Sequence, residues 1–180
     1  MSADVSDLSL VRRVQRGDKG AFDALVLKYQ HKVVKLVMRY VRNPAEAEDI
    51  AQEACIRLGR SIRSFKGQSA FRTWLYALTL NVVRDHQRQS LRRRRDEGRL
   101  ANDPVFRAEL EPGNDQRGDW LWAAVRLLPE KQRDAVLLVH SEGLSHAAAA
   151  EVLDCSENTV SWHLHEARKR LKDLLKKEAV

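Results

Sequence analysis

Apolar side chains recur at spacings of three and four residues along most of the chain, which is the period of an α-helix with one buried face. In the first 90 residues three features interrupt this pattern: Gly17, Asn43–Pro44 and the segment 65–69. Glycine commonly follows a helix end, whereas Asn followed by Pro is a helix start, because Asn caps the helix and proline has no N–H to leave unpaired. With Asp18 as a further cap, the pattern predicts four helices, over about residues 8–16, 20–41, 44–61 and from Ser69 onward.

The apolar positions of these helices predict one shared core. A compact bundle follows, because four helices with short connections bury their apolar stripes against one another. The predicted core residues are Phe22, Leu25, Val26, Tyr29, Val33, Leu36, Val37 and Tyr40 in the second helix, Ile50, Ala54, Leu58 and Ile62 in the third, and Phe71, Leu75, Leu78 and Val82 in the fourth.

The other face of the fourth helix interleaves aromatic residues with Arg and Asn. Such a surface suits stacking on bases and binding of phosphates. The loop before the helix contains Gly67, which allows a backbone turn that other residues resist. The alternative is an amphipathic core helix whose Trp and Tyr pack inside. The candidate nucleic-acid residues are Phe65, Lys66, Gly67, Gln68, Ser69, Trp74, Tyr76, Asn81, Arg84 and Arg88.

A second helical unit follows a segment without periodicity. Residues 92–118 begin with four consecutive arginines and then carry scattered Pro and Gly, which predicts a linker. Helices are then predicted over about 120–128, 129–141 and 146–153, and from Glu157 to about Lys176. The last two are joined by a four-residue turn, the helix-turn-helix pattern. The alternative is a helical hairpin used for dimerisation.

The predicted fold class is therefore all-α, with helical domains at 1–91 and 119–180 joined by the linker. Val160, Leu164, Ala167, Leu171 and Leu174 form the predicted buried stripe of the last helix. Its opposite face and first turn supply the candidate residues for reading duplex DNA. These residues are Asn158, Thr159, Ser161, Trp162, His165, Glu166 and Lys169.

Charge supports an anionic partner. The 180-residue chain has a formal net charge of +7, and the first 90 residues carry essentially all of the excess. Cys55 and Cys155 lie far apart and form neither a metal-ligand pair nor a disulfide framework. Apolar runs are too short to span a membrane and the N-terminus lacks the pattern of a signal peptide, which predicts a soluble cytoplasmic protein.

Catalytic motifs are absent from the sequence. It contains no paired carboxylates, no phosphate-binding glycine loop and no zinc-protease motif. His163 and His165 lie two residues apart on a helix and cannot share a ligand face, so they are predicted to lie at the surface or face DNA. The sequence predicts a protein that is not an enzyme and has no cofactor and no metal.

Five blocks, in this order and at this spacing, resemble the extracytoplasmic-function group of bacterial RNA polymerase sigma factors, in the sigma-70 family. Together they cover nearly everything except the linker and the ends. They are RVQRGDKGAFDALVLKYQ (13–30), EAEDIAQEACIRL (46–58), SFKGQSAFRTWLYALTLN (64–81), LPEKQRDAVLL (128–138) and GLSHAAAAEVLDCSENTVSWHLHEARKRL (143–171).

The resemblance implies a two-domain factor that binds core RNA polymerase and directs it to promoters. Asp49, Gln52 and Glu53 would bind the clamp helices of the largest subunit, and the second domain would meet the flap. The loop at 65–69 would receive a flipped base of the −10 element and Asn81 would contact bases, while the last helix would read the −35 element. The linker would run towards the polymerase active centre, and an anti-sigma factor would hold the protein inactive.

Two departures from the family pattern concern promoter choice. Ala77 stands where many relatives carry Arg, and the reading helix is less basic than is common in relatives. The alternative function is a helix-turn-helix regulator that acts without replacing the sigma subunit. It predicts tight operator binding in the absence of polymerase.

Overall fold

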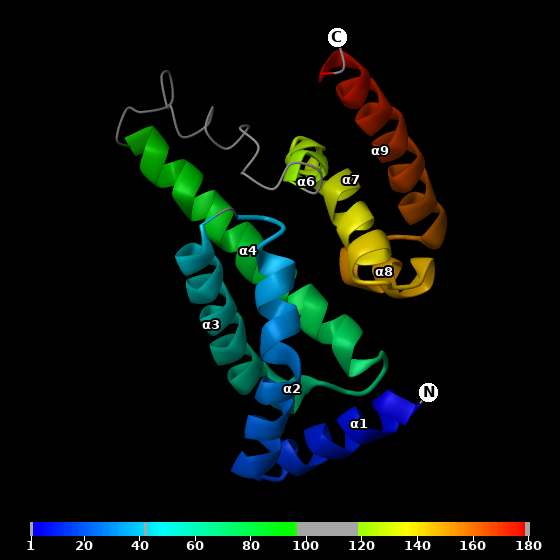
Figure 1. Ribbon diagram of the computed structural model, residues 1–180. Coiled ribbons are helices and arrows are strands. Elements are labelled where there is room, and N and C mark those ends of the chain that lie inside the picture. The colour runs from blue at the N-terminus through cyan, green and yellow to red at the C-terminus, as the bar shows by residue number, and fades with distance from the viewer. Residues whose placement is uncertain (1, 42, 97–118, 179–180) are drawn as a thin grey trace. The chain divides into compact units, whose positions relative to one another are not determined.

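The computed structural model describes residues 2–41, 43–96 and 119–178, and within these ranges the chain forms helices and no strand. It divides into two compact units, Met1–His86 and Gln87–Val180 (Figure 1). The predicted all-α class is confirmed. No helix in the described ranges is long and apolar enough to cross a membrane.

The first unit contains the four predicted helices and one short 3₁₀ turn. Asp18 and Asn43 cap α2 and α3 as predicted, each accepting a backbone N–H: that of Ala21 at 3.0 Å and that of Ala45 at 2.9 Å. The elements are α1 (Ser2–Gln15), α2 (Lys19–Val37), α3 (Pro44–Ser61), η1 (Ile62–Ser64) and α4 (Phe71–Asp96).

Some helix limits differ from those expected. α1 begins six residues earlier than predicted, at Ser2, and α2 ends at Val37, where the N–H groups of Tyr40 and Val41 both donate to the Val37 carbonyl and close a turn. Ser69 does not cap α4, because the carbonyl of Ala70 accepts the first helical bond, from Trp74.

α4 also continues through the arginine run to Asp96, where the linker was predicted to have begun. The domain limits 1–91 and 119–180 stay predictions, and the rest of the predicted linker, 97–118, lies outside the described residues.

The core of the first unit forms around α2, which packs against α1 and α3. α4 joins it through Phe71, whose ring meets the edge of the Tyr29 ring at a centroid distance of 5.4 Å. Asp7, only 1% exposed, accepts hydrogen bonds from Lys28 and from the Tyr29 hydroxyl, so this buried carboxylate is paired. Burial, followed by the contact with Asp7, raises the pKa of Tyr29 well above its usual value.

The second unit contains the predicted helix-turn-helix. Its elements are α6 (Asp119–Arg126), α7 (Glu130–Val136), a π-helical segment η3 (Leu137–Ser141), α8 (His146–Leu153) and α9 (Glu157–Glu178). The Ser145 hydroxyl caps α8, accepting from the Ala148 N–H at 3.1 Å, as predicted. Asp154 ends α8 with φ +50°, a left-handed conformation that Asp tolerates better than most residues.

α9 packs against α6, α7 and α8. Val160, Leu164 and Ala167 are buried, as predicted, whereas Leu171 and Leu174 are only half-buried. The buried stripe of α9 is therefore shorter than the helix.

Candidate nucleic-acid interface

The loop between η1 and α4 is turned outward at its centre. Gly67 has φ +71°, a conformation that favours glycine, and Lys66, Gly67 and Gln68 are exposed. Ser69 is half-buried. The loop therefore presents a polar, positively charged tip.

Two of the predicted nucleic-acid residues belong to the core instead. Phe65 is 7% exposed and packs against Phe71 and Trp74, with ring centroids 5.8 and 5.2 Å away. Tyr76 is 1% exposed, because it lies in one row with the buried Leu80, one turn further along α4. Tyr76 therefore packs inside, as the alternative for this helix predicted, and α4 buries a wider face than its aliphatic residues alone indicate. The DNA contacts of Phe65 and Tyr76 stay predictions.

The remaining predicted residues of α4 lie at the surface to different degrees. Asn81 and Arg88 are exposed, and Trp74 and Arg84 are half-buried. Arg88 lies beyond the boundary of the first unit, on the last turns of α4. The loop tip, the open part of Trp74 and Asn81 make up the candidate surface of the first unit.

Gln15 fixes the base of the loop and was missed by the sequence analysis. Its Nε2 donates to the carbonyl oxygens of Ile62 and Phe65, at 3.0 and 2.9 Å. Leu8, on the same helix, approaches the loop so closely that a Cβ on Gly67 would lie 3.7 Å from its Cδ2. The only signal in the sequence is that this amide follows the apolar positions of α1.

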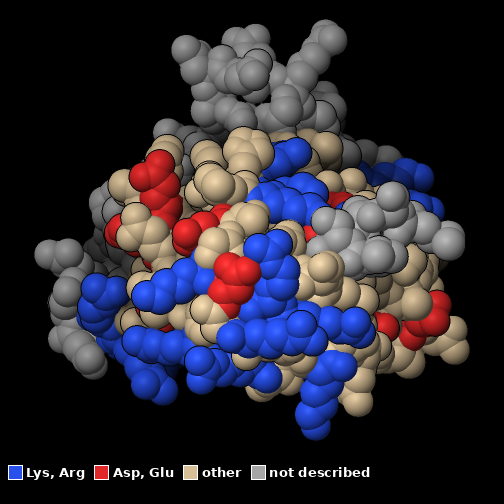
Figure 2. Space-filling model, turned by 90° about the horizontal axis from the view of Figure 1, so that it is seen from below, with Lys and Arg blue, Asp and Glu red and all other residues tan. Residues whose placement is uncertain are grey.

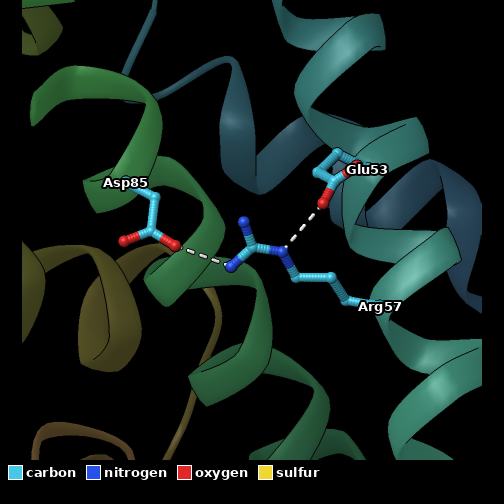
Figure 3. A network of polar contacts seen from close by, with 3 residues as sticks. All are labelled: Glu53, Arg57 and Asp85. Atoms are coloured by element: carbon cyan, nitrogen blue, oxygen red, sulfur yellow. Dashed lines mark hydrogen bonds and ion pairs between the residues drawn. The ribbon is translucent and has the colours of Figure 1, made fainter. Parts of the chain in front are cut away.

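The predicted docking residues of α3 divide into two groups. Asp49 and Gln52 are exposed, as a docking surface requires. Glu53 instead accepts a hydrogen bond from Arg57 Nε at 2.9 Å, and Arg57 Nη1 donates to Asp85 on α4 at 2.6 Å (Figure 3). The hydrogen bonds to Asp85 and then to Glu53 raise the pKa of Arg57.

A second contact joins the same two helices, since Glu46 Oε1 lies 3.4 Å from Nδ1 of His86. Polar contacts therefore link α3 to α4. Glu53 takes part in these contacts and also belongs to the predicted docking residues.

In the second unit, α9 presents the predicted reading face. Asn158, Ser161, Trp162, His165 and Lys169 are exposed, while Thr159 and Glu166 are half-buried. Trp162 is 56% exposed. A large exposed aromatic side chain of this kind suits a partner that covers it.

The start of α9 and the residues around it are held by side-chain contacts. The Ser156 hydroxyl accepts from the Thr159 N–H at 3.1 Å and lies 2.8 Å from the Thr159 hydroxyl. The Ser161 hydroxyl lies 3.0 Å from Nδ1 of His146, at the start of α8. His146 was not among the predicted residues, and its contact fixes the first part of the reading face.

His163 is buried, and its prediction as a surface residue was wrong. It lies three residues after Val160 and four before Ala167, within the inward stripe of α9. Burial, followed by the charge of Lys131, lowers the pKa of His163. Among the described residues no group of three His, Cys, Asp or Glu side chains is placed to hold a metal ion.

Family models and relatives agree with this arrangement. Residues 25–95 match sigma-70 region 2, and residues 118–171 match sigma-70 region 4. RNA polymerase sigma-H factor of Pseudomonas aeruginosa is 39% identical over 95% of this chain and 94% of its own. ECF RNA polymerase sigma-E factor of Haemophilus influenzae is 37% identical over 96% of this chain and 97% of its own. The chain belongs to the extracytoplasmic-function sigma factors of the sigma-70 family.

The fold of this sigma factor is shared with a solved relative. The sigma factor RpoE of Bartonella quintana, in complex with the anti-sigma factor NepR, aligns with a TM-score of 0.71 at 22% identity, over 86% of this chain and 96% of that one. The region 2 match spans the loop and most of α4, and the region 4 match spans the helix-turn-helix. The candidate surfaces of the two units therefore fall within these two regions of the sigma factor.

Proposed function

We propose that this protein binds core RNA polymerase in the cytoplasm and directs it to a specific class of promoters, with α3 as a docking helix. The loop at 66–69 and α4 would recognise and open the −10 element, and α9 would read the −35 element. One observation carries the proposal: each unit presents an exposed polar and aromatic surface within a region of the sigma-70 family. Any catalysis belongs to the polymerase, since the role assigned to this chain is binding.

Reconstitution with core polymerase tests the function as a whole. Sequencing of the 5′ ends of transcripts made with and without this protein should reveal a new set of start sites that share −10 and −35 elements. If the isolated protein instead binds a duplex operator tightly and leaves the start sites of the polymerase unchanged, it is a helix-turn-helix regulator and the proposal is wrong.

Docking is proposed to depend on Asp49 and Gln52. Asp49→Lys should abolish co-purification with core polymerase and leave the helical content intact. Reversal of the charge places like charges opposite each other at the interface, which costs more binding free energy than loss of the contact alone. Glu48→Lys is the matched control, since Glu48 is also exposed, adjacent in sequence and turned about 100° around the helix. Equal loss in both variants would indicate a general charge effect and would contradict the assignment.

Glu53 is a poor test of docking. Its replacement would also remove the partner of Arg57 and disturb the link from α3 to α4. An effect of Glu53→Lys on assembly would therefore not distinguish a lost polymerase contact from a shifted α4.

Control by an anti-sigma factor is proposed on two grounds. The Bartonella relative is solved with such a factor bound. In this chain a groove of about 580 Å³ between α2 and α3 is flanked by Leu27 and Ile56, which are 69% and 49% exposed, and Ile56 lies one turn from Gln52. A protein covering this groove would also cover the proposed docking surface. Overproduction of the sigma factor alone should then activate its promoters without a stress signal. If the overproduced protein is soluble and bound to polymerase but its promoters stay inactive, this proposal is wrong.

A further inference from the structure

A basic face lies on the first unit outside the surfaces described above. Arg12, Arg16 and Arg63 are all exposed. Figure 2 shows Lys and Arg side chains crowding the side of the molecule seen from below, the side on which α1 lies in Figure 1. We name Arg12, Arg16 and Arg63 the α1–η1 basic face.

Helix geometry places this face beside the loop. Leu8, Arg12 and Gln15 lie at i, i+4 and i+7 on α1 and so share one side of the helix. Leu8 approaches Gly67 of the loop, and Gln15 is bonded to the carbonyls of Ile62 and Phe65. Arg12, between them in this row, must therefore face the same loop.

The other two arginines extend the face on either side. Arg16 follows Arg12 by one helical turn, and Arg63 belongs to η1, which α1 contacts directly. Arg63 also lines a hollow together with Lys19 at the start of α2 and with the carboxylates Asp18 and Asp23. Since Lys66 is exposed at the loop tip, positive charge continues from the loop onto α1.

We propose that Arg12, Arg16 and Arg63 bind the phosphates of single-stranded DNA where it leaves the loop. This rests on the proposed function, in which the loop receives a base of the opened −10 element. A strand whose base enters the loop must continue across one of the adjoining surfaces, and its backbone carries a negative charge at each nucleotide. Arginine matches phosphate well, because its planar guanidinium donates two parallel hydrogen bonds.

The chemistry of the face favours phosphate over a protein. Among the described residues no carboxylate pairs with Arg12, Arg16 or Arg63, whereas the neighbouring Arg13 lies 2.8 Å from Asp18. The core of a protein interface is usually depleted of charged residues and enriched in aromatic ones. The exposed residues of the loop tip beside this face, Lys66 and Gln68, are polar and not aromatic.

The test uses holoenzyme reconstituted from core polymerase and the full chain. Forked promoter probes carry the −10 element in single-stranded form and end either directly after it or after a longer single-stranded extension. A triple variant, Arg12→Gln, Arg16→Gln and Arg63→Gln, is compared with the wild type across a range of salt concentrations. Lys35→Gln is the charge control, because Lys35 is exposed and lies about 24 Å along α2 from its first residue.

The wild type and Lys35→Gln should bind the long probe more tightly than the short one, and the triple variant should lose this preference. For single strands each phosphate contact contributes about 0.7 to the slope of log K against log salt. Loss of three contacts makes the slope shallower by about 2. The factor by which affinity falls between 50 and 200 mM salt should therefore be roughly 20 times smaller for the variant than for the wild type.

Two results would overturn the inference while leaving the proposed function intact. In the first, the triple variant keeps the wild-type salt slope and the preference for the long probe. In the second, it assembles poorly with core polymerase but keeps the probe preference once assembled, which would make the basic face a protein contact. If wild-type holoenzyme bound neither probe, the proposed function itself would fail.

Discussion

Replacement of Gln15 by Met should loosen the loop without damaging the core. Met has nearly the length of Gln and a similar helix propensity, so the change removes the two donors and leaves no cavity. Each lost hydrogen bond costs about 0.5–1.5 kcal/mol. Because the carbonyls of Ile62 and Phe65 are only part-buried and can turn to water, we expect the free energy of unfolding of the first unit to fall by about 1–2 kcal/mol.

The fluorescence of Trp74 provides the assay, since the other three tryptophans lie in the second unit and can be replaced by Phe. Urea unfolding in that background reports on the first unit alone. Gln30→Met, at an exposed position of α2, is the matched control and should leave the midpoint unchanged.

A second readout separates loop placement from stability. Holoenzyme with Gln15→Met should discriminate less between −10 sequences, while its assembly with core polymerase stays at the wild-type level, because α3 is untouched. Gln15→Lys, which retains donors at the end of a flexible chain, should recover part of the discrimination. If Gln15→Met matches Gln30→Met in both midpoint and −10 preference, the two hydrogen bonds do not position the loop and the reasoning is wrong.

Further predictions concern the second unit. Trp162→Ala and Glu166→Ala should change which −35 bases are preferred, whereas Lys169→Ala should weaken all promoters by a similar factor, since a phosphate contact carries no sequence information. Selection from a randomised −35 library measures both effects, and an unchanged preference in Trp162→Ala would mean that the exposed ring meets a protein. The pKa of His163 is lower in the folded protein than its ordinary value of 6.5, so the unfolded chain binds a proton more readily as the pH falls below 6.5. The free energy of unfolding of the second unit should therefore decrease with pH in this range. His163→Leu should remove this part of the pH dependence, as thermal unfolding at a series of pH values would reveal; a pH dependence equal to that of the wild type would contradict the assignment.

The sequence by itself determined the helices and most of their limits. Caps are local: the Asp18, Asn43 and Ser145 side chains bond N–H groups two or three residues away, so residue type and position decide them. The order and spacing of the five motif blocks also sufficed for the family, because they extend over both units.

Only the tertiary structure decided the direction of several side chains. Tyr76 and His163 carry polar groups, so their residue types are compatible with the protein surface. Neighbouring helices nevertheless bury both side chains. Their sequence positions are compatible with either side of a broad amphipathic face, so periodicity alone could not place them.

The contacts that shape the candidate site are likewise tertiary. Gln15 bonds to carbonyls 47 and 50 residues away, and Arg57 reaches Asp85 across 28 residues. No local pattern predicts such pairs, because backbone carbonyls carry no sequence signal and any acidic residue can pair with an arginine. The sequence therefore determined the segments that are proposed to face polymerase and DNA. Packing decided which side chains within them are exposed, since each helix buries the side chains that its neighbours cover.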